Sequence, residues 1–353
     1  MKKTILILLA IILLLSSCSS SFPKLKPSRE LRSDKIEEVD NWFYYLGFDD
    51  LEKNYKAILA SDYDLVVIEP VFTEKNNLDY DISKFVNALH NKKDRLVVAY
   101  IDIGQAEEWR SYWQADWVLG NPEWIVATDP DGWEGNYPVA YWYKDWQDIF
   151  LNPKTGYLQK LLDAGFDGVY LDWIEAYSDN FVLTKAKTDG VNTVEEMINW
   201  VEKLGRYARA QRPEFLVIAQ NAAELTTNDD YLEVIDALAQ EQIWFDGGSD
   251  NNPPGDCPLP NTATEIDSQN YFNSLSPACQ RVYTMYPEST LHVSSSEYLV
   301  ELVQARANGL PIFTVDYALN EDNIKQVYKN SKDLGFIPFA SNRLLNIFVP
   351  ERY

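Results

Sequence analysis

Acidic and polar side chains recur in this sequence where apolar segments end. The segment GVYLDW (168–173) alternates as a buried strand does, but then presents Asp172 and Trp173. Carboxyl groups gathered in one place can act as general acids and bases or bind a ligand. The residues in such positions are Glu69, Asp102, Asp172, Asn221, Glu241, Asp316 and Tyr317.

The segments that carry these residues are predicted to be eight short strands. Their ranges are 41–47, 64–70, 95–104, 168–173, 215–221, 235–245, 310–318 and 335–341. Strands that are apolar on both faces and alternate with amphipathic helices indicate a parallel sheet, and eight of them indicate an α/β fold of the (β/α)8 TIM-barrel type. The carboxyl ends of barrel strands meet at one face, so the polar residues are expected to line a common site.

Two interpretations of these carboxylates stay open at this point. A carboxylate inside a barrel mouth costs several kcal/mol of desolvation unless something pairs with it or uses it. A set of acids is therefore expected to be functional. The alternative is that some of them cap loops or bind a structural cation.

The N-terminal residues are read as targeting sequence. Two lysines, an apolar run and the residues LSSC predict a lipoprotein signal peptide over 1–17, with lipidation of Cys18. Residues 18–38 are rich in serine, proline and charge, which predicts a flexible tether before a domain at 39–353. We expect a lipid-anchored protein of the bacterial cell envelope, facing the periplasm or the exterior. An uncleaved membrane anchor is the alternative, but the apolar run is short for one.

Composition restricts the partners and cofactors. The formal net charge is −23, and nucleic acid requires a basic footprint, so it is not an expected partner. With Cys18 assigned to lipid, Cys257 and Cys279 remain, inside a segment at 246–296 that is predicted as an insertion between strands six and seven. They are predicted to form a disulfide, with two free thiols as the alternative. Two histidines offer no conventional zinc site, so neither a metal nor another cofactor is expected.

Several motifs resemble a known family. VVAYIDIGQAEEWRSYW, GNPEWIVATDPDGWEGNYPVAYWYKDW and GFDGVYLDWIEAY are similar to glycoside hydrolase family 114, the endo-α-1,4-polygalactosaminidases. The similarity is greatest to an extracellular bacterial and archaeal branch once labelled as related to cysteinyl-tRNA synthetase. The HIGH and KMSKS-type motifs of such a synthetase do not occur in the sequence. The resemblance implies an endo-acting glycosidase whose substrate is a polysaccharide or oligosaccharide.

The resemblance also implies roles for individual residues. Asp172 occupies the place of a catalytic aspartate, here expected to be the nucleophile, and Glu241 that of the acid/base, with Glu224 as the nearest rival. The remaining residues are assigned to substrate binding: Glu69, Tyr100, Asp102, Trp173, Asn221, Glu224, Asp316 and Tyr317. Glu69 departs from the aspartate common in relatives, and the insertion is also unusual.

The tryptophans bear on the substrate. Seven of the eleven fall between strands three and four: Trp109, Trp113, Trp117, Trp124, Trp133, Trp142 and Trp146. Indoles can stack on sugar rings, although for any single one of them a core position is the alternative. Two other functions stay open, a non-catalytic carbohydrate-binding lipoprotein and a structural envelope protein.

Overall fold

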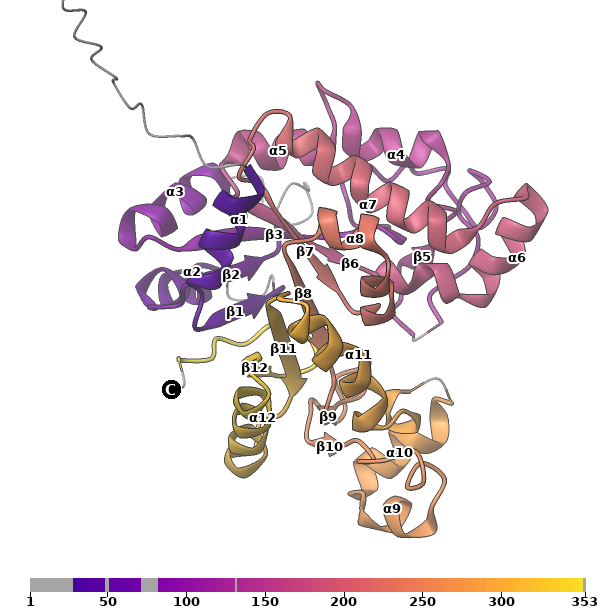
Figure 1. Ribbon diagram of the computed structural model, residues 1–353. Coiled ribbons are helices and arrows are strands. Elements are labelled where there is room, and N and C mark those ends of the chain that lie inside the picture. The colour runs from indigo at the N-terminus through magenta and orange to yellow at the C-terminus, as the bar shows by residue number, and fades with distance from the viewer. Residues whose placement is uncertain (1–27, 48–50, 71–81, 131, 288, 352–353) are drawn as a thin grey trace, which may run out of the picture.

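The computed structural model describes residues 28–47, 51–70, 82–130, 132–287 and 289–351. Within them, eight parallel strands curl into a nearly closed barrel (Figure 1). In sheet order they are β1 (Trp42–Tyr45), β2 (Leu65–Ile68), β3 (Leu96–Asp102), β6 (Gly168–Asp172), β7 (Leu216–Gln220), β8 (Ala237–Glu241), β11 (Ile312–Tyr317) and β12 (Ile337–Ser341). Each predicted strand is present and in the predicted order, so the barrel prediction is confirmed.

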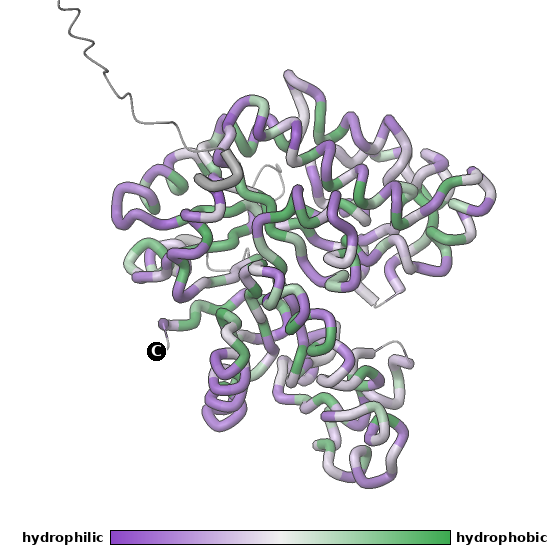
Figure 2. The backbone as a smooth tube through the Cα atoms, viewed as in Figure 1, coloured by the Kyte–Doolittle hydropathy of each residue, from purple (hydrophilic) through white to green (hydrophobic). Residues whose placement is uncertain are grey.

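The strands are apolar on both faces because one face packs inside the barrel and the other packs against helices. The four residues of β1 and the four of β2 are all buried. The tube in Figure 2 is accordingly green along the strands and more purple along the helices around them. At the seam between β1 and β12, the Trp42 indole N–H donates to the carbonyl oxygen of Ile337 at 3.0 Å.

The helices that follow the strands cover the outside of the barrel. Their bounds are α2 (Leu51–Ala60), α3 (Ile82–Lys92), α4 (Lys144–Leu151), α5 (Tyr157–Ala164), α6 (Asn180–Asp189), α7 (Thr193–Arg209), α8 (Asp229–Val234), α11 (Ser295–Ala307) and α12 (Glu321–Asp333). On α7 the buried residues Met197, Val201 and Leu204 share one face, as helical spacing requires.

Residues 28–38 were predicted as part of the flexible tether, and there the structure differs. Helix α1 (Ser28–Glu37) lies in this range. Arg32 on it donates from Nε to Asp236 Oδ1 at 2.8 Å, and Ile36 is buried. These partners are distant in sequence, so the local composition could not reveal them.

The connection from β3 to β6 holds β4 (Gln105–Glu107), β5 (Asn136–Pro138), α4 and α5. Its aromatic rings pack into the main core. The rings of Trp124 and Trp146 lie 5.2 Å apart, and both side chains are buried. The apolar side chains of this long connection therefore belong to the same core as those of the barrel.

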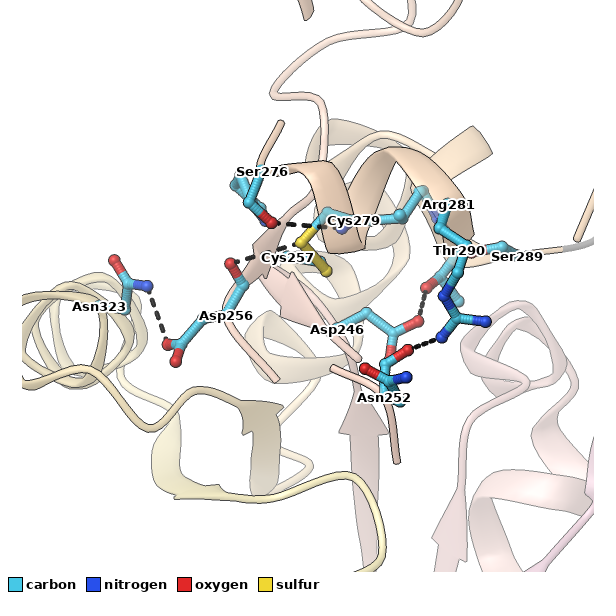
Figure 3. The surroundings of a disulfide bond; sticks show 12 residues. Asp246, Asn252, Asp256, Cys257, Ser276, Cys279, Arg281, Ser289, Thr290 and Asn323 are labelled. Carbon is cyan, nitrogen blue, oxygen red and sulfur yellow. Dashed lines mark hydrogen bonds between the residues drawn. A yellow bond between two sulfur atoms is a disulfide. The ribbon is translucent and has the colours of Figure 1, made fainter. Parts of the chain in front are cut away.

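The segment between β8 and β11 is the predicted insertion. It contains β9 (Phe245–Asp246), β10 (Cys257–Pro258), α9 (Gln269–Ser274), α10 (Pro277–Met285) and the short 3₁₀ helix η3 (Thr290–His292). Cys257 and Cys279 form a disulfide, which confirms that prediction (Figure 3). The disulfide belongs to a small apolar cluster separate from the main core, with Leu259, Tyr271 and Leu291 among its members.

In the part of the chain that the structure describes, no helix is both long and apolar enough to cross a membrane. The predicted signal peptide and Cys18 lie outside the described residues.

Candidate active site

A cavity of about 850 Å³ opens at the carboxyl ends of the barrel strands. Eight of the ten residues predicted for the site line it: Glu69, Tyr100, Asp172, Trp173, Asn221, Glu224, Glu241 and Tyr317. Asp102 and Asp316 do not. The insertion supplies one wall, with Asp246, Tyr286 and Thr290 among its lining residues, and α11 adds Glu297 and Glu301.

Asp172 and Glu241 face each other across one amide. Gln220, the last residue of β7, donates from Nε2 to Asp172 Oδ1 at 2.5 Å and to Glu241 Oε2 at 3.0 Å. Because both bonds start at one nitrogen, these two carboxylate oxygens are at most 5.5 Å apart. The sequence reasoning named the next residue, Asn221, and missed Gln220.

Each acid of the pair has further donors. Asp172 accepts the Tyr100 hydroxyl at Oδ2 at 2.5 Å and the backbone N–H of Trp173 at Oδ1 at 2.7 Å. Glu241 accepts the Tyr317 hydroxyl at Oε1. Two N–H groups thus donate to Asp172, while the N–H of Gln220 and the Asn221 side chain both favour the ionised form of Glu241. A hydroxyl can accept as well as donate, so either acid can carry a proton beside its tyrosine.

Burial raises the pKa values of both carboxyls of the pair. It raises the pKa of Asp172 to about 7, with the Glu241 carboxylate adding to the rise and the donor Tyr100 opposing it. Burial also raises the pKa of Glu241, and the positive charge of Arg343 opposes that rise. Two facing carboxyls with raised pKa values favour a state with one proton between them.

Glu175 is a third acid in the cavity that the site prediction did not include. It sits on the 3₁₀ helix η1 (Ile174–Ser178) and accepts from Asn221 Nδ2 at 2.8 Å. Burial, with the Asp172 charge next, raises its pKa to about 8. Its position in DWIEAY, three residues after Asp172, was the available signal.

The backbone turns sharply after the three strands that carry this group. Trp173 (φ 54°), Asn221 (φ 58°) and Gln242 (φ 56°) each follow directly on β6, β7 or β8 in the left-handed region. Such a conformation is uncommon outside glycine and tends to cluster at functional sites. It places Asn221 so that its side-chain oxygen accepts the backbone N–H of Glu241 at 3.1 Å.

The other lining acids have different partners. Glu69 is ion-paired with Arg110, which donates from the same guanidinium to Glu107 at 2.6 Å. Both carboxylates and the arginine are buried. Glu224 accepts the hydroxyl of Tyr177. Glu69 therefore shares its counter-ion Arg110 with Glu107, while Glu224 has a neutral hydroxyl as its partner.

Asp102 and Asp316 accept hydrogen bonds from backbone N–H groups and do not line the cavity. Asp102 Oδ1 accepts the N–H groups of Gly104 at 3.0 Å and Gln105 at 2.7 Å. Asp316 Oδ1 accepts those of Trp244 at 2.7 Å and Phe245 at 2.9 Å. Both side chains are buried, and for these two acids the loop-capping alternative describes the structure.

Most of the tryptophans between β3 and β6 belong to the core. Trp124 and Trp146 are buried, and Trp113, Trp117 and Trp142 pack against the core while partly exposed. Only Trp109 and Trp133 of these seven line the cavity, where Trp173 joins them.

The positively charged side chain of Arg343 lies in the cavity wall near Glu241. The guanidinium of Arg343 lies 4.7 Å from the centre of the Tyr317 ring and 5.3 Å from that of Trp133. Its Nε is 3.3 Å from Asp246 Oδ1, and Asp246 also accepts the Thr290 hydroxyl (Figure 3). Through these contacts the insertion is tied to the barrel beside the acid pair.

No cluster of histidine, cysteine and acidic residues with the geometry of a metal site occurs among the described residues. The two facing carboxyls can perform acid–base and nucleophilic chemistry, and they lie in a cavity of about 850 Å³.

Comparison with known proteins gives matches along most of the chain. The sequence model of glycoside-hydrolase family GH114 matches residues 34–351. An uncharacterized protein of Deinococcus radiodurans is 30% identical over 325 residues, covering 92% of this chain and 86% of that protein. Another, of Thermotoga maritima, is 30% identical over 251 residues, covering 69% of this chain and 70% of that protein.

Two solved structures share the fold. The glycoside hydrolase domain of PelA from Pseudomonas aeruginosa gives a TM-score of 0.54 at 14% identity, covering 88% of this chain and 97% of that one. Aspergillus fumigatus Ega3, solved in complex with galactosamine, gives 0.55 at 15% identity, covering 87% of this chain and 93% of that one.

Proposed function

The chain belongs to glycoside-hydrolase family GH114 and is a glycosidase, and from that premise we propose that Asp172 and Glu241 cleave a cationic amino-sugar polymer. The observation that carries the proposal is the pair itself, the half-buried Asp172 and the buried Glu241 bridged by Gln220 in the wall of the cavity.

Asp172 acts as the nucleophile and Glu241 as the acid/base. The two donor-only N–H groups on Asp172 favour its ionised form, which a nucleophile needs. The proton of the pair then resides on Glu241, which gives it to the leaving oxygen and later takes one from water.

The spacing supports retention of the anomeric configuration. Retaining enzymes hold their carboxyls about 5 to 5.5 Å apart, whereas inverting enzymes need about 6.5 to 9.5 Å for a water. The facing oxygens of Asp172 and Glu241 are at most 5.5 Å apart. This bound on the facing oxygens is compatible with the closer spacing, and hence with a direct nucleophilic attack by Asp172.

The charge of the cavity supports an amino-sugar substrate. Its described lining contains ten acids: Glu69, Glu107, Asp129, Asp172, Glu175, Glu224, Glu241, Asp246, Glu297 and Glu301. Arg343 is the one basic residue among the described lining residues. Such a surface attracts ammonium groups, and Ega3, a structural neighbour, was solved with galactosamine. Trp109, Trp133 and Trp173 supply apolar faces for the rings.

The test compares two polymers that differ only in N-acetylation, α-1,4-linked galactosamine and its acetylated form. We expect wild-type protein to release reducing ends from the free amine, and we expect added salt to raise KM by screening the charges. Equal rates on both polymers would contradict an amino-sugar substrate. Full turnover by Asp172→Asn or Glu241→Gln would contradict the pair.

We further propose that the enzyme acts in the cell envelope, anchored through a lipid on Cys18. The motif LSSC after an apolar run supports this location. In cells that process lipoproteins, wild-type protein should sediment with membranes, and Cys18→Ala should not carry the lipid. Equal lipid labelling of both forms would contradict the assignment.

A further inference from the structure

Gln220 has no role in the proposed acid–base exchange, yet it contacts both acids. Resting on the proposed function, we infer that Gln220 is a positioning residue that fixes the spacing of Asp172 and Glu241 and stabilises their ionised forms. The inference extends the function to a residue that itself neither attacks nor transfers a proton.

The amide of Gln220 is fully engaged. Its nitrogen has two hydrogens, and the structure gives it one carboxylate oxygen for each. Its carbonyl oxygen accepts the Tyr44 hydroxyl at 3.2 Å. The opposite amide orientation would aim the carbonyl oxygen at two carboxylates, so the acids and Tyr44 together select the orientation seen. Gln220 is 3% exposed and Tyr44 is 1% exposed, so little water competes for these bonds.

The topology explains why this position, and no neighbouring one, can bridge the pair. β7 lies between β6 and β8 in the sheet, and its last residue points into the barrel between their last residues. Another glutamine of the cavity lining, Gln240, donates from Nε2 to Asn221 Oδ1 at 3.0 Å and to the backbone oxygen of Glu241 at 3.1 Å. Gln240 thus supports the β8 backbone and leaves the carboxylates to Gln220.

The electrostatic surroundings make a shared neutral donor useful. The titratable groups that act on Asp172, besides Glu241, are acids or phenols: Tyr44, Tyr100, Asp102, Glu107, Tyr170 and Glu175. Those that act on Glu241, besides Asp172, are Arg343, Asp246, Tyr317, Tyr170, Tyr44, Glu175 and Tyr298, and the Asn221 side chain is a neutral donor beside it. Arg343 acts from the Glu241 side. Among the described residues, Gln220 is therefore the one hydrogen-bond donor that both carboxylates share.

The test uses the full folded protein and does not depend on knowing the sugar. In Gln220→Leu, which keeps the approximate size and removes both donors, the side-chain carboxyl ¹³C signals of Asp172 and Glu241 are titrated by NMR. We expect the lower midpoint of the pair to rise by about one pH unit, because the donors that favour the charged form are gone. Tyr44→Phe, which frees only the amide oxygen, should shift it in the same direction by less.

Turnover gives the second readout. Gln220→Leu should lower kcat about 100-fold through misplacement of the two acids, and the acid limb of the pH profile should move upward with the NMR midpoint. KM should change far less. The matched control is Gln147→Leu, since Gln147 is a buried glutamine on α4 that bonds to the Tyr141 backbone outside the cavity lining. It should leave both the midpoint and kcat unchanged.

An unmoved titration midpoint in folded Gln220→Leu would overturn the inference, whatever the activity. An equal loss of kcat in Gln147→Leu would also overturn it, since the effect would then be one of general packing. If no polymer is hydrolysed by the wild type while the midpoint still shifts, the proposed substrate fails and the positioning role stands.

Discussion

The strand ends of β6, β7 and β8 differ from those of β3 and β11, although all five present polar groups at the same face of the barrel. In the first sector, Asp172 and Glu241 bond to side chains that line the cavity. In the second, Asp102 and Asp316 bond to backbone N–H groups of the following loops.

The position of an acid at the end of a barrel strand therefore does not by itself define its role. A carboxylate that satisfies loop N–H groups stabilises the fold, and in both Asp102 and Asp316 the second oxygen accepts no hydrogen bond from the described residues. A carboxylate held by side chains in the wall of a cavity can meet a ligand. The partner of each acid therefore separates the two sectors.

The largest loss of activity is expected from a substitution in the first sector. Asp172→Asn should reduce kcat by about 10³-fold or more, because the amide is neither a nucleophile nor an acid of suitable pKa. Thermal unfolding should be little changed, since the amide oxygen can accept from Gln220 and Trp173 while the amide NH2 donates to the Tyr100 hydroxyl. A reducing-end assay and calorimetry on the same sample measure both, and wild-type kcat in this variant would contradict the catalytic assignment.

The second sector should respond in the opposite way. Asp316→Ala leaves the N–H groups of Trp244 and Phe245 without their acceptor, which should lower the free energy of unfolding by about 2 to 4 kcal/mol. The folded fraction should retain kcat within about tenfold of wild type. Urea denaturation gives the first quantity. A variant as stable as wild type but inactive would place Asp316 in the reaction.

A smaller effect concerns pH and the acids of the first sector. In the unfolded chain Asp172 and Glu175 ionise near pH 4, whereas folding raises their pKa values to about 7 and 8. The folded state thus holds protons that the unfolded state has lost. The contribution of these two groups to the free energy of unfolding is fully present below about pH 4, and it is lost as the pH rises through the folded pKa values of about 7 and 8.

Glu175→Gln should flatten that decline, because its side chain no longer titrates. The difference in the free energy of unfolding between wild type and variant should change by more than about 1 kcal/mol from pH 5 to pH 8. Chemical denaturation across this range provides the values. Parallel pH curves for the two proteins would show that Glu175 titrates normally in the fold.

The barrel was predictable from sequence because its signal is local. Segments such as DLVVIEP and GVYLDW are apolar on both faces, and eight of them alternate with amphipathic helices. Helix α1 escaped prediction because its stability depends on the distant partner Asp236. The insertion was placed correctly, but its small helices α9 and α10 lack a long apolar period.

The site was predictable only in part. Strand ends located Asp172 and Glu241, but Gln220 looked like the last residue of a buried strand, and its two bonds are tertiary. Asp102 carried a local signal that was available: in DIGQ an aspartate precedes a glycine by two residues, as in a turn capped by its own side chain. Asp316 offers no such pattern, since its partners lie about seventy residues earlier.

One measurement tests the central claim most directly, namely the mass of Glu241→Gln after reaction with a galactosaminide that carries a good leaving group. Such a substrate needs little acid help to glycosylate the enzyme, while removal of the base slows release. We expect an added mass of one sugar unit, located by peptide mapping on Asp172. An adduct on another residue, or none while the substrate is consumed with inversion, would contradict it.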